Sequence, residues 1–181
     1  MAVAAMATLG SAHLDGDVAV IGGTAGQRTM ALRAVDRFVA DGLSLPALEI
    51  RFHAHRSGCH WRLGYYEDGV ASICGTHVNQ MAFRGLLHEM AHGWLNANLS
   101  EIDRARFLDL RGLRVWNDPE VPWDERGFEQ AAEIMAWALG DQGDGILRPS
   151  FPDNSIGELR AAYGLLTGHA LPDWRAKLAF A

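Results

Sequence analysis

The chain lacks any concentration of positive charge. Its 16 lysine and arginine residues are outnumbered by 22 aspartate and glutamate residues, and no run of basic residues compensates locally. Because nucleic-acid-binding proteins neutralise phosphates with basic side chains, this composition argues against nucleic acid as a partner. The sequence also contains no stretch of about 18 apolar residues, the length that a membrane-spanning helix needs. We therefore expect neither a nucleic-acid partner nor a membrane partner.

The N-terminus lacks the features of a secretion signal. It is rich in alanine, but it has no basic segment, and Asp15 and Asp17 interrupt it before a long apolar core develops. We therefore expect a cytoplasmic protein. Only two cysteines occur, Cys59 and Cys74, and free thiols are the default in a reducing compartment. A disulfide between them is the alternative, which their spacing leaves open.

Internal repeats and low-complexity linkers are also absent. A chain of 181 residues has the length of one ordinary domain and can bury a core without disulfides. We expect a single domain over residues 1–181. Residues 1–20 are a candidate disordered segment, and residues 141–181 are a C-terminal helical extension containing the predicted helix "SIGELRAAYGLLTG".

The apolar residues recur with periods that predict an α+β fold. Thr24 precedes Gln27 by three residues, a capping box that begins a helix. The predicted buried face of this helix consists of Met30, Ala34, Val35, Phe38 and Val39. The segment "ALEIRFHAH" alternates apolar and polar residues as a strand does, and "WRLGYYEDGVASICG" predicts a hairpin around Asp68. These segments predict a small sheet of about three strands.

Three more helices are predicted after the sheet. The segment "MAFRGLLHEMAHGWLNANL" has apolar residues at helical spacing throughout. In "SEIDRARFLDLR", Ser100 and Asp103 form a second capping box, and Gly112 is placed to end the helix. The helix "FEQAAEIMAWALG" ends at Gly140.

The segment "LLHEMAHGW" places His88 and His92 four residues apart in the first of these three helices. A helix turns by about 100° per residue, so both imidazoles project from one face and can reach a single ion. Glu89 is displaced around the helix, so its carboxylate can reach a water molecule rather than the ion. This H-E-x-x-H pattern is the signature of zinc metallopeptidases. The alternative is two partly exposed histidines with Glu89 on a solvated face.

A third ligand is available downstream. The segment "FEQAAEIMAW" places Glu129 and Glu133 on one helical face, and the small Ala132 and Ala136 flank them. Small residues would allow this helix to approach the histidine helix closely. One carboxylate can then bind the metal while the other accepts a hydrogen bond from a ligand histidine. An ordinary solvated acidic face is the alternative for this pair.

The pair "HEMAH" and "EQAAE", some forty residues apart, resembles the compact gluzincin-like metallopeptidases of the minigluzincin group. The segment from "LDLRGLRVW" to "EQAAEIMAWAL" is similar to small bacterial and phage proteins that contain this motif. The resemblance implies one Zn²⁺ ion held by His88, His92 and Glu129, with Glu89 as the general base. It places Glu133 where such families have a hydrogen-bonding acid, which is commonly Asp.

The resemblance also implies a substrate-binding edge strand before the zinc helix, here "VASICGTH". An extended peptide can add to such an edge through main-chain hydrogen bonds. His77 lies at the end of this segment and is a candidate transition-state donor, although a turn histidine without a role is the simpler interpretation. Tyr65 and Tyr66 are equally candidates for this donor.

The function predicted from the sequence is that of a zinc metallopeptidase with a peptide or protein substrate. The alternatives are a regulatory protein that retains a metal-stabilised peptidase fold, and a metal-independent helical binding module. The loop "NDPEVPWDERG" could place Trp123 in the substrate cleft together with the preceding Trp116, although loop tryptophans more often pack locally.

Overall fold

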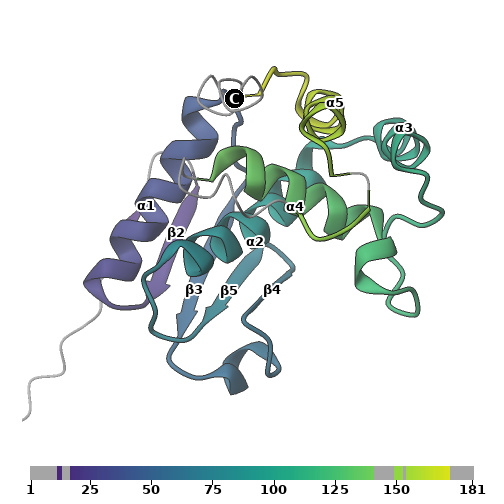
Figure 1. Ribbon diagram of the computed structural model, residues 1–181. Coiled ribbons are helices and arrows are strands. Elements are labelled where there is room, and N and C mark those ends of the chain that lie inside the picture. Colours follow the sequence, from purple (N-terminus) through teal and green to yellow (C-terminus); the bar gives the residue numbers. More distant parts are fainter. Residues whose placement is uncertain (1–11, 14–16, 141–148, 153, 172–181) are drawn as a thin grey trace, which may run out of the picture.

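The computed structural model describes residues 12–13, 17–140, 149–152 and 154–171 (Figure 1). Its helices are α1 (Ala25–Ala40), α2 (Gln80–Asn98), α3 (Glu101–Arg111), α4 (Gly127–Leu139) and α5 (Ile156–Thr167). Its strands are β1 (Ala12–His13), β2 (Val18–Gly22), β3 (Leu48–His53), β4 (Gly64–Glu67) and β5 (Val70–Cys74). Two short 3₁₀ helices, η1 (Arg56–Cys59) and η2 (Trp123–Glu125), lie in the connections. The predicted α+β fold is confirmed.

The strands form one sheet in the order β1-β2-β3-β5-β4, so the prediction of about three strands was too low. The two strands that the sequence did not reveal are β1, which pairs antiparallel with β2, and β2, which pairs in parallel with β3. The candidate disordered segment 1–20 therefore contains β1 and the first three residues of β2, while residues 1–11 and 14–16 lie outside the described part. Because β2 is short and its partner is distant in the sequence, its local pattern gave a weak signal.

The strand before α2 is not at the edge of the sheet, contrary to the expectation for "VASICGTH". Strand β5 lies between β3 and β4, and β4 forms the edge on this side. A tight turn brings β4 back along β5, and its residues Asp68 and Gly69 both have positive φ, 48° and 81°. Turns with positive φ at both central residues are favoured in two-residue hairpins, because the twist of the turn matches the twist of the two strands. The predicted hairpin is confirmed, and it covers the edge that β5 would otherwise present.

The capping signals identified the helix boundaries well. Thr24 and Ser100 each form the predicted capping box, with Gln27 and Asp103 respectively. Gly112 and Gly168 end α3 and α5 in the left-handed conformation, and Gly140 follows α4. The buried face of α1 is as predicted except for Val39, which is 58% exposed because it lies at the margin of the buried stripe.

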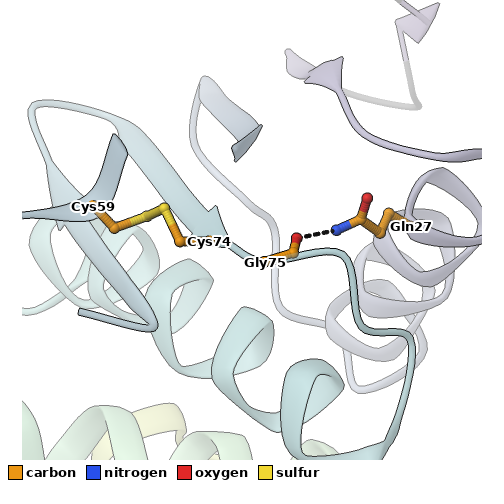
Figure 2. The surroundings of a disulfide bond; sticks show 4 residues. All are labelled: Gln27, Cys59, Cys74 and Gly75. Atoms are coloured by element: carbon orange, nitrogen blue, oxygen red, sulfur yellow. Dashed lines mark hydrogen bonds between the residues drawn. A yellow bond between two sulfur atoms is a disulfide. The ribbon is translucent and has the colours of Figure 1, made fainter. Parts of the chain in front are cut away.

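The cysteines form a disulfide, so the expectation of free thiols was wrong. Cys59 in η1 is bonded to Cys74 at the end of β5, across a sequence separation of 15 residues (Figure 2). The next residue, Gly75, accepts a hydrogen bond through its carbonyl oxygen from Nε2 of Gln27 in α1, at 2.8 Å. The disulfide therefore closes a loop that contains the edge strand β4.

Helix α2 lies at the centre of the molecule. It contacts β3, β5 and β4 of the sheet, and it also contacts α1 and α4 (Figure 1). On α4, Ala132 and Ala136 are fully buried, which allows the close approach to α2 that their small size predicted. Helices α3 and α5 pack against α4. No helix in the described ranges is long and apolar enough to cross a membrane.

Candidate metal centre

Three predicted ligands meet between α2 and α4. Nε2 of His88 and Nε2 of His92 lie 3.0 Å apart, and Oε2 of Glu129 lies 3.2 Å from each of them. The two histidines project from consecutive turns of α2, and Glu129 comes from the first turn of α4. Both histidines are buried, with 8% and 4% of their surface exposed. These three side chains form a group that could hold a metal ion.

The spacing of the donor atoms fits a small tetrahedral ion. Zinc binds imidazole nitrogen and carboxylate oxygen at about 2.0–2.2 Å, which places neighbouring donors in a tetrahedral site about 3.4 Å apart. The observed separations of 3.0–3.2 Å are close to this value. Two imidazoles and one carboxylate are also a typical donor set for catalytic zinc, in which the fourth position belongs to water.

Burial and charge set the protonation of these ligands in the metal-free site. Burial lowers the pKa of His92 to about 4, so its ring is neutral at pH 7, the form that binds metal. Burial acts in the same direction on His88, but the hydrogen bond to Glu129 and the adjacent Glu133 outweigh it and raise its pKa to about 10. Burial alone would raise the pKa of Glu129, but hydrogen bonding with both histidines outweighs burial and holds this pKa well below its usual range. A metal ion must therefore displace one proton from His88.

Glu133 lies one turn beyond Glu129 on α4 and contacts the opposite nitrogen of the same histidine. Its Oε1 is 3.2 Å from Nδ1 of His88, a contact at ion-pair distance that is not aligned as a hydrogen bond. Its other oxygen forms an ion pair with Arg84, which lies one turn before His88 on α2. A carboxylate on Nδ1 favours the tautomer whose Nε2 is free to bind metal. Glu133 is therefore well placed for the orienting role that the sequence suggested.

Glu89 is buried beside the cluster, with 8% of its surface exposed. Burial raises the pKa of its carboxyl group to about 7, while the charges of His88 and Arg62 act in the opposite direction. The start of β4 passes very close to this side chain. A Cβ atom on Gly64 would lie 2.8 Å from Oε1 of Glu89 and 3.0 Å from the carbonyl oxygen of Ser72. Glycine at this position therefore leaves the space that Glu89 occupies.

The two loop tryptophans have different environments. The ring of Trp123 stacks on His88, with 6.1 Å between ring centroids and an interplanar angle of 25°, and 41% of Trp123 is exposed. Trp116 packs against Phe128 and against a buried ring of α3, so it belongs to the local core. The Trp123 loop is held by Gln130, whose Nε2 donates to the carbonyl oxygen of Asp124 at 2.7 Å. Only one of the two tryptophans thus reaches the site.

Two cavities of similar size adjoin the cluster, and His88, Glu89, Trp123 and Gly64 line both. The first, here called the apolar cavity, has a volume of about 630 Å³ and extends along the N-terminal turns of α2. The second, the polar cavity, has a volume of about 640 Å³ and extends past His92. Both lie within the range of about 300–1,000 Å³ that is usual for ligand sites.

The three candidate transition-state donors lie in different parts of this cleft. His77 is exposed and lines the apolar cavity, whereas Tyr65 and Tyr66 line the polar cavity. Tyr66 packs beside α2, and its hydroxyl accepts a hydrogen bond from the backbone N–H of Gly69 at 3.2 Å. Tyr65 points to the opposite face of β4, where its ring meets His60. The donor role therefore stays a prediction for each of them.

Sequence reasoning missed two residues that the fold places at the site, Arg84 and Gly64, and it left open whether Trp123 lines the cleft. A signal existed for Arg84, because it lies four residues before His88 and must therefore share its helical face. No local signal existed for Gly64, whose role depends on how closely β4 passes α2. The contact of Trp123 likewise depends on the tertiary path of its loop.

Comparisons with known proteins add no assignment. No known family matches the chain, and neither a curated protein nor a solved structure is significantly similar to it. The candidate function therefore depends on the geometry of the site.

Proposed function

We propose that this protein is a zinc-dependent peptidase with a single metal ion. The observation that supports this most strongly is the convergence of His88, His92 and Glu129 at donor distances that match tetrahedral zinc. The partly open surroundings of the cluster supply the second requirement. Two cavities reach the same residues, so a water molecule and a substrate would both have access to an ion held there.

A bound zinc ion would supply Lewis acidity, which polarises a carbonyl group and lowers the pKa of water. Glu89 then acts as the general base: its carboxylate takes the proton of the attacking water and delivers it to the nitrogen of the leaving amine. Glu89 is suited to both steps by its position, since its carboxyl group is buried beside the three metal-binding side chains and lines both cavities. Glu133 and Arg84 hold the His88 ring in position from behind.

The edge strand β4 is the place where we expect the peptide to bind. In the described part of the chain no other strand pairs with the outer edge of β4, so its backbone groups can bond to an extended peptide. Gly64 and Tyr66 of this strand lie directly beside the metal cluster. The substrate-binding edge is therefore retained from the sequence prediction, but it moves from β5 to β4.

The test of this proposal is a Glu89→Gln variant. Glutamine has nearly the same shape but cannot accept the proton of water, so zinc should remain stoichiometric while hydrolysis of a peptide library falls at least about 100-fold. Glu101→Gln, at an exposed position of α3 that lines neither cavity, serves as the matched control and should cleave normally. Cleavage by Glu89→Gln at the wild-type rate would overturn the mechanism. Zinc binding by a wild-type protein that cleaves no peptide would instead support a regulatory role.

The compartment is a separate question. The cytoplasmic location expected from the sequence stays a prediction, and the disulfide counts against it. Disulfides persist mainly in oxidising compartments, because cytosolic reductants keep thiols reduced.

A further inference from the structure

The apolar cavity begins at the reacting groups. His88 and Glu89 form its inner end, and its walls come from the start of β4, the end of β5 and the first turns of α2. A side chain that enters it must therefore belong to a residue next to the scissile bond.

The chemistry of the walls favours an apolar occupant. Leu63, Met81 and Trp123 lie at the rim with 61%, 56% and 41% of their surfaces exposed, an unusual exposure for large apolar residues around one opening. The charged residues Arg84 and Glu133 of the wall are paired with each other. An apolar substrate side chain would therefore cover apolar surface without removing the partner of a charge.

The depth of the cavity depends on a glycine in the middle of α2. Gly85 lies one turn before Glu89 and one turn after Met81, on the helical face that forms the cavity wall. Glycine destabilises a helix interior relative to alanine, so it usually has a packing reason. No such packing reason is present at Gly85, because a Cβ atom there would meet no described atom within 4 Å beyond the helix backbone itself.

Other helical glycines of this region have such a reason. A Cβ atom on Gly93 would lie 3.2 Å from side-chain atoms of Leu48 and Tyr66, and one on Gly127 would lie 2.7 Å from Leu108. Those glycines allow close packing of neighbouring elements. Gly85 instead faces the open space of the cavity, so the effect of its missing side chain is to keep that space empty.

We propose that Gly85 determines the specificity of this site by leaving room for a large apolar side chain, such as leucine or phenylalanine, next to the scissile bond. This inference rests on the proposed peptidase function. The polar cavity on the other side of Glu89 has a different lining, including Arg62, Glu67 and Arg126, and accommodates the remainder of the peptide.

The first experiment compares cleavage of a peptide library by wild type, Gly85→Ala and Gly85→Leu. Wild type should prefer large apolar residues at one position beside the cleaved bond. Gly85→Leu should lose this preference in favour of glycine and alanine, with kcat/KM for large residues falling about 10–100-fold. Gly85→Ala should lie between them. Gly157→Leu, at an exposed glycine of α5, is the matched control and should leave the preference unchanged.

The second experiment does not require turnover. Zinc-loaded protein is titrated with two hydroxamates, one with an isobutyl group next to the zinc-binding group and one with hydrogen there. Wild type should bind the isobutyl compound at least about tenfold more tightly, and Gly85→Leu should abolish this difference while it binds the smaller compound normally. An unchanged difference in Gly85→Leu would overturn the role of Gly85. Absence of zinc or of hydroxamate binding in wild type would instead contradict the proposed function itself.

Discussion

The buried carboxyl group of Glu89 should make the metal-free protein less stable as the pH rises. Its pKa is about 7 in the folded protein, raised mainly by burial, against an ordinary value of 4.5 that applies in the unfolded chain. Between these two values the folded state binds more protons than the unfolded state. The stabilising effect of this proton is fully present below about pH 4.5 and is lost as the pH rises through about 7.

The size of the effect follows from the same two values. Each pKa unit corresponds to about 1.4 kcal/mol, so ionisation of buried Glu89 lowers the free energy of unfolding by about 2 kcal/mol between pH 5 and pH 8. Glu89→Gln has no such ionisation. The free energy of unfolding of this variant, relative to wild type, should therefore increase by about 2 kcal/mol over this interval.

The assay is urea unfolding of both proteins, with a strong chelator present, at pH 5 and at pH 8. Glutamine also buries an amide, but that cost is independent of pH and cancels in the comparison between the two pH values. A difference between wild type and Glu89→Gln that stays constant with pH would refute the argument, because it would mean that Glu89 is not desolvated in the fold. Zinc should abolish the effect, since its charge favours the carboxylate.

Three further predictions concern the ligands, the edge strand and the disulfide. Glu129→Ala should largely empty the site at micromolar zinc, whereas Glu133→Ala should lose only about 10–100-fold in zinc affinity. Zinc titration of both metal-free variants checks this. A larger loss of affinity in Glu133→Ala than in Glu129→Ala would exchange the two roles. Gly64→Ala should displace Glu89 and lower peptidase activity at least about tenfold while zinc is retained, because the new methyl group would lie 2.8 Å from the Glu89 carboxylate. An unchanged cleavage rate would contradict this contact. Reduction of the disulfide, which spans 15 residues, should lower the free energy of unfolding by about 3 kcal/mol, as measured by denaturant titration. An identical unfolding midpoint with and without reductant would show that the bond does not constrain the fold.

Local patterns were sufficient for most of the elements. Capping residues such as Thr24 and Ser100 act on backbone groups within three residues, so their effect can be recognised in the sequence alone. Strand order depends on contacts between distant segments, and no local pattern specifies it. For this reason β1 and β2 were missed, and the edge of the sheet was assigned to β5 instead of β4.

The candidate site was predictable where its residues share a helix. His88, Glu89 and His92 are related by helical spacing, and Glu129 and Glu133 are related in the same way on α4. The sequence could not show how the two helices pack, which decides that Arg84 pairs with Glu133. It also could not show that Gly64 passes against Glu89 or that Gly85 opens onto a cavity, because both depend on the empty space around a glycine.

The claim on which the other inferences depend is that His88, His92 and Glu129 hold one zinc ion. Elemental analysis of protein purified without chelator, together with zinc titration of the metal-free protein, tests it most directly. We predict one zinc ion per chain in the wild type and a loss of that zinc in His92→Ala, with α1, α2 and the sheet still folded. A wild-type protein that contains no metal and takes up no zinc, or a His92→Ala variant that binds zinc as tightly as wild type, would contradict the claim.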